Sequence, residues 1–493
     1  MVLMIQLRVY SKRRVWDKTR GCYVYDIRFR SRSELTDRTI EVGRAFGLGI
    51  DEEKEHIIFD EFELKLAEGD VCYISGDSGS GKSVLLRALA EDLGNRAINI
   101  ADVEADPEKP LIDTVGRTFQ EAVSLLSKVG LNDAFLFLRR YPELSDGQKY
   151  RYRIAKMIDS GKPYWICDEF ASTLDRTTAK IVAYNIQKLA RRGGTTLIVA
   201  TTHIDLEEDL NPSIRIQKGW GEEVKVDYRP NKEAPFCTVT KDVRIREGSM
   251  ADYDKLSHLH YRSEKLRFPL KIYAMEREGE LIGVIGYKYA PVNTSGRRKV
   301  VGRTVPIDEL NRDWCIIDRV ILHPKYRTTG LGTRLVRETL PLVNRRYVEL
   351  VAVMAQYNPF AEHAGMRKIQ ESTPDAKVFS AIEELRALGF NPVLLASEGA
   401  NLRRLSQLTS EEIDKVREIL LTVPYYKRFI SGQKPYYRRE EIRKWLWNQD
   451  LPSLAKRLKT LSVLSETKVY LFWSQGWLKE GSGAASDIKG ETS

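Results

Sequence analysis

The stretch Gly76-Asp-Ser-Gly-Ser-Gly-Lys82-Ser83 decides the fold of the N-terminal half of this 493-residue chain. It follows the apolar run Val71–Ser75 and leads into a segment of helical character, Lys82–Leu93. Glycines allow the backbone to wrap closely around a phosphate, and the N-terminus of the following helix attracts an anion. We therefore expect a strand–loop–helix unit that binds ATP and Mg²⁺, with Lys82 on the β- and γ-phosphates and Ser83 on the metal. The predicted ATP-binding residues are Gly76, Asp77, Ser78, Gly79, Ser80, Gly81, Lys82 and Ser83.

Two later apolar runs end in side chains suited to the same nucleotide. The run Tyr164–Cys167 is followed by Asp168 and Glu169, which predicts a metal ligand and then a carboxylate near the attacking water. The run Thr195–Ala200 ends three residues before His203, whose imidazole can reach the γ-phosphate. Strands that alternate with helices in this way are typical of an α/β fold.

Together with Leu144-Ser-Asp-Gly-Gln148, these segments resemble the ABC ATPase family over about residues 50–215. The resemblance implies that Asp168 binds the metal and that Glu169 is the catalytic base. It also implies that Asp175 belongs to the D-loop and that His203 is the switch histidine. In that family the signature of one cassette closes over ATP held by another, so this single cassette is expected to form a homodimer with two ATP molecules. The implied signature residues are Leu144, Ser145, Asp146, Gly147 and Gln148.

The chain departs from the family pattern at three points, and the last two of them, like the fused second domain, argue against a transporter subunit. Asp146 stands where the signature usually has its first glycine. The interval from Lys82 to Ser145 is 63 residues (145 minus 82), which predicts a reduced helical subdomain. Gln120 is only a weak candidate for the Q-loop glutamine, because it lies in a helical stretch.

A second cofactor loop follows in the C-terminal half. The apolar strand Trp314–Leu322 runs into His323-Pro-Lys-Tyr-Arg327-Thr-Thr-Gly-Leu-Gly332, and a helix is expected over Thr333–Leu340. This arrangement places a glycine loop and a helix N-terminus where a pyrophosphate could bind. It resembles the GNAT acetyltransferase family over about residues 240–370, which implies acetyl-CoA as a cofactor. The implied acetyl-CoA-binding residues are Val320, Leu322, Arg327, Thr328, Thr329, Gly330, Leu331, Gly332, Thr333 and Asn358.

Acetyl transfer needs a base for the attacking amine and an acid for the leaving thiolate. Asp318 lies on the strand that often carries the base in that family, but it could equally be ion-paired with Arg319. The family's usual tyrosine position holds Ala361 here. Tyr357 is the nearest substitute as the catalytic acid, and it could equally be a packing residue.

The expected fold class is α/β, with a P-loop ABC-type ATPase domain, then an α+β GNAT acetyltransferase domain and a helical C-terminal region. A composition change between Pro230 and Pro235 is the expected linker. The predicted domains are a basic β-rich segment packed with the ATPase (1–50), the ATPase (51–230), the acetyltransferase (236–372), a basic, mainly helical region (373–480) and a disordered tail (481–493).

Positive charge gathers in two parts of the chain. Residues 1–32 carry nine Lys/Arg and two Asp, a net of +7, and residues 424–444 carry seven Lys/Arg and two Glu, a net of +5. Cations interleaved with Tyr and Trp favour RNA, because rings stack on bases and cations contact phosphates. A solvated basic face, or aromatic residues in a helical core, is the alternative. The predicted nucleic-acid contacts are Lys427, Arg428, Arg438 and Arg439.

The two modules together resemble a chiefly archaeal fusion of an ABC-type ATPase with an acetyltransferase. By analogy with RNA cytidine acetyltransferases, we expect an ATP-dependent enzyme that acetylates a base amine in RNA, with tRNA the first choice. Two alternatives remain: a protein or small-amine acetyltransferase with a nucleotide-regulated dimer switch, or a clamp that only senses acetyl-CoA. The sequence has no apolar run of transmembrane length and no CxxC spacing, so a cytoplasmic location without a membrane partner is expected.

Overall fold

The computed structural model describes residues 8–31, 35–47, 54–259, 266–294, 296–353, 355, 358–423 and 438–478. Tyr357, Lys427, Arg428 and the predicted tail 481–493 lie outside these residues. The chain forms two compact units. The first comprises Met1–Lys265, Tyr273–Val284 and Ile321–Leu335, and the second comprises Leu266–Ile272, Ile285–Val320 and Val336–Ser493.

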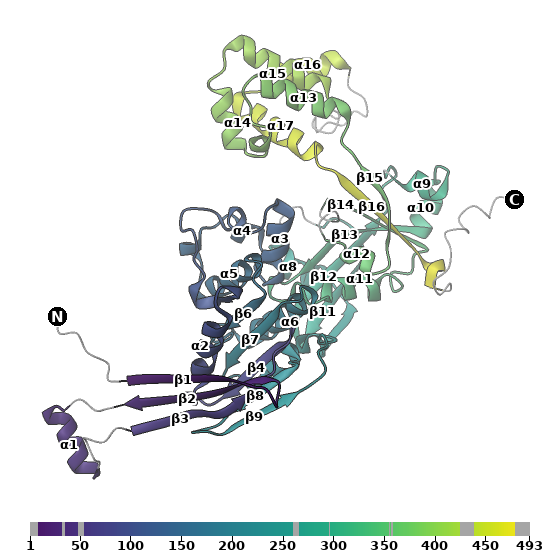
Figure 1. Cartoon of the computed structure of the whole chain (residues 1–493). Coiled ribbons are helices and arrows are strands. Elements are labelled where there is room, and N and C mark those ends of the chain that lie inside the picture. The colour runs from purple at the N-terminus through teal and green to yellow at the C-terminus, as the bar shows by residue number, and fades with distance from the viewer. Residues whose placement is uncertain are drawn as a thin grey trace. The chain divides into compact units, whose positions relative to one another are not determined.

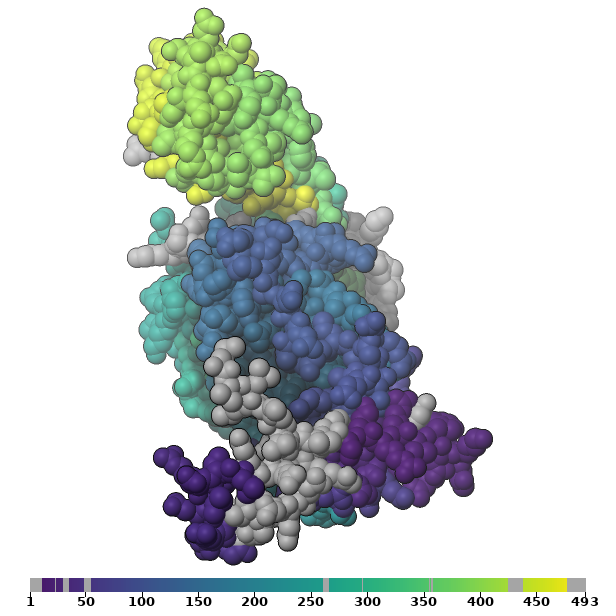
Figure 2. All heavy atoms as spheres, turned by 60° about the vertical axis from the view of Figure 1, so that its left-hand side comes forward, coloured from purple at the N-terminus to yellow at the C-terminus, as the bar shows by residue number. Residues whose placement is uncertain are grey.

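An antiparallel sheet of three strands begins the first unit: β1 (Arg8–Asp17), β2 (Cys22–Ser31) and β3 (Lys54–Glu63). The β-rich segment predicted over residues 1–50 contains β1 and β2, but the sequence does not predict α1 (Asp37–Phe46), which Thr36 caps by accepting from Thr39 N. The Lys12 ammonium joins the sheet to the ATPase, since it donates to the carbonyl of Ala88 at 2.9 Å. In Figure 2 the purple N-terminal residues lie beside the blue residues of the ATPase.

A six-stranded sheet in the order β5-β6-β7-β4-β8-β9 forms the ATPase core. The central strand β4 is buried on both faces, because helices cover one face while the helix Lys82–Leu93 and strands β2 and β3 cover the other. Val71 and Tyr73 belong to the hydrophobic core on one face, and Cys72 and Ile74 belong to the core on the other. The strands are β4 (Val71–Gly76), β5 (Ala97–Asn99), β6 (Tyr164–Cys167), β7 (Thr196–Thr201), β8 (Ile214–Lys218) and β9 (Val224–Tyr228).

Strands β5, β6, β7, β4 and β8 run parallel, so their carboxyl ends meet at one edge of the sheet. This edge carries Gly76 at the end of β4, Asp168 directly after β6 and His203 after β7. The topology therefore gathers the predicted nucleotide residues. The helices of this module are α2 (Lys82–Leu93), α3 (Phe119–Lys128), α4 (Ala134–Phe137), α5 (Asp146–Asp159), α6 (Arg176–Arg192) and α7 (Glu207–Leu210).

The third sheet has seven strands in the order β10-β11-β12-β13-β14-β16-β15. Strands β13 and β14 are parallel, and their register ends at the pair Ile317 and Leu350 although β13 continues to Leu322. The two strands thus part at Asp318. The strands are β10 (Val243–Glu247), β11 (Pro269–Arg277), β12 (Glu280–Tyr289), β13 (Trp314–Leu322), β14 (Tyr347–Ala352), β15 (Arg367–Ser372) and β16 (Lys468–Ser474). Helices α8 (Met250–Ser257), α9 (Arg297–Val301), α10 (Ile307–Asp313), α11 (Leu331–Thr339) and α12 (Phe360–His363) connect them.

The last strand, β16, lies between β14 and β15 and is antiparallel to both. The predicted acetyltransferase boundary at residue 372 leaves this strand out. The helices between β15 and β16 are therefore an insertion into the sheet's connectivity (Figure 1). They have a hydrophobic core of their own. They are α13 (Ala376–Ala387), α14 (Glu398–Leu405), α15 (Ser410–Thr422), α16 (Arg439–Trp447) and α17 (Leu451–Leu464).

A buried ion pair ties the end of the chain to this sheet. Glu349 of β14 is fully buried and accepts from Arg297 through both oxygens, at 2.8 and 2.6 Å. The hydroxyl of Tyr470, on β16, donates to the same carboxylate at 2.6 Å. Burial and the Glu349 carboxylate both raise the pKa of Tyr470, so the phenol stays protonated and remains a donor.

None of the described helices combines the length and the apolar character needed to cross a membrane. The five cysteines are all buried and unpaired. Burial raises the pKa of Cys72, Cys167 and Cys315, as expected for small core residues.

Candidate ATP and acetyl-CoA sites

Glycine is required at two positions of the phosphate loop. Gly76 has φ 146° and Gly81 has φ 106°, both in the region that favours glycine. A Cβ on Gly76 would overlap the carbonyl oxygen of Lys218, and one on Gly81 would overlap the Ile58 side chain. The loop is therefore a close-fitting backbone turn, as a phosphate cradle requires.

The Lys82 ammonium folds over this loop and donates to the carbonyls of Gly76 at 2.7 Å and Asp77 at 2.6 Å. Burial lowers the pKa of Lys82, while Asp168, Asp77 and Glu169 act against that shift. The neighbouring Ser80 hydroxyl is buried and has no hydrogen-bond partner within the described residues. A cation and an unsatisfied hydroxyl beside the glycines fit a bound phosphate.

The acids after β6 lie on a backbone of unusual conformation. Glu169 has φ 45° and Ala171 has φ 60°, left-handed values that cost energy for non-glycine residues. The segment is held in place because Ala171 N donates to the Tyr150 hydroxyl at 2.9 Å and Phe170 N donates to the carbonyl of Ala200 at 2.8 Å. Tyr150 lies on α5, so the backbone of the predicted catalytic carboxylate is connected to the helix whose first turn holds the signature.

Two protein oxygens are available for Mg²⁺ at this edge, the Asp168 carboxylate and the Ser83 hydroxyl. One Asp168 oxygen accepts from the backbone N of Glu169 at 2.9 Å, which orients the carboxylate. Within the described ranges, no group of three His, Cys, Asp or Glu side chains could hold a metal by itself. This donor set suits Mg²⁺, which commonly takes one or two protein ligands and completes its shell with water and nucleotide phosphates.

The signature residues begin α5. The backbone N of Ser145 donates to the Gln148 side chain at 3.0 Å, which caps the helix. Leu144 is buried, whereas the Asp146 side chain is 91% exposed and can contact a partner. Gly147 approaches the D-loop closely, because a Cβ there would lie 3.3 Å from the Leu174 side chain.

His203 is placed by its backbone. Its carbonyl accepts from the Tyr73 hydroxyl at 2.8 Å, and its N donates to the Thr201 hydroxyl at 3.1 Å. Its position after β7 is on the same edge as the phosphate loop. The weak Q-loop candidate, Gln120, is exposed in the first turn of α3.

In the predicted acetyl-CoA loop, Gly330 has φ 86°, and a Cβ on Gly332 would meet open space. The Arg327 guanidinium turns into the protein, where it donates to the carbonyls of Leu322 at 3.0 Å and Asn132 at 2.7 Å. Burial lowers its pKa. Arg327 therefore shapes the loop, and the backbone N–H groups are the donors best placed for a pyrophosphate.

Asp318 lies on β13 where that strand parts from β14. Its carboxylate is 3.0 Å from the ammonium of Lys288, on β12, and 3.5 Å from Arg319. Asp318 is thus ion-paired, and Lys288 is a closer partner than Arg319, which the sequence suggested. Asn358 is exposed.

The structure pairs much of the basic charge that the sequence singled out. Lys12 and Arg14 both pair with Asp92, and Arg28 pairs with Asp26. In the inserted helices, the rings of Trp447 and Trp445 lie under the guanidinium groups of Arg443 and Arg457, each at 4.8 Å. Arg438 and Arg439 are exposed at the start of α16. These two remain available for a polyanion.

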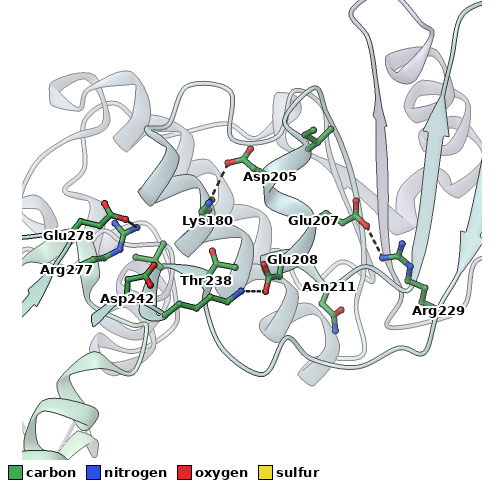
Figure 3. A pocket seen from close by; sticks show the side chains of 13 residues that line it. Lys180, Asp205, Glu207, Glu208, Asn211, Arg229, Thr238, Asp242, Arg277 and Glu278 are labelled. Atoms are coloured by element: carbon green, nitrogen blue, oxygen red, sulfur yellow. Dashed lines mark hydrogen bonds and ion pairs between the residues drawn. The ribbon is translucent and has the colours of Figure 1, made fainter. Parts of the chain in front are cut away.

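A polar pocket of about 760 Å³ lies beside α6 (Figure 3). Four cations and five acids line it, so it has no excess of positive charge to attract a phosphate. The ion pairs in it are Lys180 with Asp205, Arg229 with Glu207, Lys241 with Glu208 and Arg277 with Glu278.

The fold and these loops define a P-loop ATPase joined to an acetyltransferase. Comparison with known protein families agrees: the ABC transporter model matches residues 59–172, and the Acetyltransferase (GNAT) family model matches residues 241–364. The Clostridium tetani methionine import ATP-binding protein MetN is 27% identical over 251 residues, which are 42% of this chain and 76% of that protein. The Sphingopyxis alaskensis cytochrome c biogenesis ATP-binding export protein CcmA is 31% identical over 167 residues, which are 30% of this chain and 83% of that protein.

A solved dimeric ATP-binding cassette with ADP and phosphate bound is 20% identical, covering 36% of this chain and 94% of that one at a TM-score of 0.31. The chain belongs to the ABC ATPase family and carries a GNAT acetyltransferase domain behind the cassette. The predicted fusion, the α/β fold class and an acetyltransferase with ATPase activity are thus confirmed. The individual site residues and the domain boundaries stay predictions.

Proposed function

We propose that this chain is an ATP-dependent N-acetyltransferase that moves the acetyl group of acetyl-CoA to a base amine of RNA, with tRNA the first candidate. The observation that carries the ATP dependence is that the phosphate loop and the predicted acetyl-CoA loop belong to the same compact unit. ATP, Mg²⁺ and acetyl-CoA are the proposed cofactors. A cytoplasmic location fits all three.

ATP drives dimerisation in this proposal. The exposed Asp146 and the Gly147 backbone at the start of α5 form the surface that closes over the nucleotide of a second copy. Lys82 and Ser83 hold the phosphates and Mg²⁺, and Glu169 activates the attacking water. Symmetric closure of two identical cassettes gives a homodimer with two nucleotides.

Acetyl transfer forms a C–N bond and breaks the C–S bond of the thioester, which acetyl-CoA supplies. The amine loses a proton and the leaving thiolate gains one. Asp318 is the proposed base, because it lies where β13 leaves β14, and Lys288 fixes its carboxylate. Tyr357 is the proposed acid, on sequence grounds alone.

Two arguments support RNA as the acceptor. The inserted helices expose Arg438 and Arg439 at the start of α16, and the sequence places Lys427 and Arg428 shortly before them. The alternative is a protein or small-amine acetyltransferase with the ABC module as a nucleotide-regulated dimer switch. The occupied rings of Trp445 and Trp447 favour it, because they leave fewer faces for base stacking.

The test supplies labelled acetyl-CoA and ATP to the full chain with total cellular RNA or protein extract. The proposal predicts label in RNA, and weaker RNA binding in the variant Arg438→Gln/Arg439→Gln. The control Arg38→Gln/Arg44→Gln removes equal charge from exposed residues of α1, outside both basic segments, and should leave RNA binding unchanged. Label found only in the protein fraction would favour the alternative function. Unchanged RNA affinity in Arg438→Gln/Arg439→Gln would refute the role of these two arginines in RNA binding.

A further inference from the structure

The acetyl-CoA loop, defined here as residues 324–333, contacts the ATPase at three places within the first compact unit. The first contact is an ion pair between Lys325 and the D-loop residue Asp175, with 2.7 Å between Nζ and Oδ1. The same carboxylate caps α6, since it accepts from the N of Thr178 at 3.2 Å. Burial raises the pKa of Asp175, but the hydrogen bonds from Lys325 and Thr178 outweigh this and lower it overall. The carboxylate is therefore ionised when it holds Lys325.

The second contact leads to the signature. The Asn132 side chain donates to the carbonyl of Pro324 at 3.1 Å, and the Asn132 carbonyl accepts from Arg327 at 2.7 Å. On the other side, Arg151 of α5 donates to the carbonyls of Gly130 at 2.7 Å and Gly147 at 3.2 Å. A continuous path of backbone and hydrogen bonds therefore runs from the signature glycine to the acetyl-CoA loop.

The third contact fixes an unfavourable backbone conformation. Thr328 has φ 68°, a left-handed value that is rare for a β-branched residue. Such a conformation persists where the surroundings hold it. The side chain of Asn185, which lies on α6 and is 9% exposed, donates to the Thr328 hydroxyl at 2.9 Å.

We infer that Asn132, Asp175 and Asn185 are positioning residues for the acetyl-CoA loop, through which ATP-driven dimer closure raises the affinity for acetyl-CoA. The inference rests on the proposed function, in that both ligands bind at the predicted loops. Closure over ATP fixes the signature, and the three contacts transmit that fixed position to the loop. A loop already held in its binding conformation costs less free energy to order when acetyl-CoA arrives.

The coupling must be reciprocal, because it is a property of binding free energies. If ATP tightens acetyl-CoA binding by a given factor, acetyl-CoA tightens ATP binding by the same factor. Coupling between two sites in proteins is commonly about 5- to 150-fold. We expect at least about fivefold here, since the contacts are direct and few.

The experiment is calorimetric titration of the full-length chain with acetyl-CoA, with and without Mg²⁺ and a non-hydrolysable ATP analogue. The variant Lys325→Gln removes the D-loop ion pair, and Lys180→Gln is the matched control. The Lys180 side chain is equally exposed (31% against 32%) and pairs with Asp205, away from the acetyl-CoA loop. The measured quantity is the affinity for acetyl-CoA with the ATP analogue divided by the affinity without it. We expect this ratio to be about fivefold or more in the wild type and in Lys180→Gln, and below about twofold in Lys325→Gln.

A second variant, Asn185→Ala, should weaken acetyl-CoA binding both with and without the analogue, because Thr328 loses its donor. ATP binding measured alone should stay unchanged in Lys325→Gln. A ratio near one in the wild type, although both ligands bind, would overturn the coupling. So would a ratio in Lys325→Gln as high as that of the wild type. Either result would leave the proposed function standing. Failure of acetyl-CoA to bind the wild type overturns both.

Discussion

Replacing Glu349 with Gln should loosen the end of the acetyltransferase sheet. The substitution keeps the shape of the side chain but leaves the Arg297 charge, which is 6% exposed, without its bidentate partner. Breaking a buried ion pair in this way costs about 3–5 kcal/mol. Local opening of β14 and β16 should therefore become about 100- to 4,000-fold more frequent, at 1.4 kcal/mol for each factor of ten.

The measurement is hydrogen exchange followed by mass spectrometry, which reports opening strand by strand in a multidomain chain. Tyr470→Phe is the matched comparison, because it removes only the donor on β16. Loss of a hydrogen bond to a charged group costs about 1.5–3 kcal/mol, so opening should rise about 10- to 150-fold. The double variant should be less than additive, since both changes act on one network. Unchanged exchange in β14 and β16 after Glu349→Gln would refute the reasoning that this pair holds the C-terminal strand in the sheet.

Three further predictions address the sites. Glu169→Gln should slow ATP hydrolysis by about 100-fold or more while ATP still binds, as expected for a general base. Phosphate release measures the hydrolysis rate and equilibrium binding measures the ATP affinity. Near-normal hydrolysis would exclude Glu169 as the general base. Asp318→Asn should lower kcat for acetyl transfer by about 100-fold or more at unchanged KM for acetyl-CoA, whereas a fall below about tenfold would favour a purely ion-paired residue. The pKa of Asp252 lies well below its usual value because Arg246 donates to it, although burial acts the other way. The stabilisation from this ion pair is complete above about pH 4, near the pKa of the unfolded state, and is lost as the pH falls toward the lower pKa of the folded state. Hydrogen exchange of α8 at pH 7 and pH 3 should show this loss of stability in the wild type. The loss should be smaller in Asp252→Asn.

The sequence predicts the local elements of both cofactor loops well. The strand Trp314–Leu322 and the helix Lys82–Leu93 have the bounds that their apolar patterns indicate. Such elements depend on neighbouring residues, which periodicity and glycine spacing report directly. The sequence does not predict helix α1, because most of its residues are polar, although Thr36 is a recognisable helix cap.

The sequence does not predict contacts between strands and side chains that lie far apart along the chain. Strand β16 is a short apolar run after five helices, and nothing local indicates that it enters the sheet between β14 and β15. Arg327 looked like a phosphate ligand, but its guanidinium meets a carbonyl 195 residues away along the chain. Lys288 likewise reaches Asp318 from a neighbouring strand. These contacts depend on topology, which a single sequence does not report.

The rate of acetyl transfer with and without ATP tests the central claim, that one chain couples its two cofactors. The full chain receives the RNA or protein fraction that accepts label, together with labelled acetyl-CoA at a concentration below its KM. Lys82→Ala, which removes the phosphate-loop ammonium, is compared with the wild type. We expect ATP to accelerate transfer in the wild type and to have no effect in Lys82→Ala. Equal rates with and without ATP in the wild type would contradict the claim.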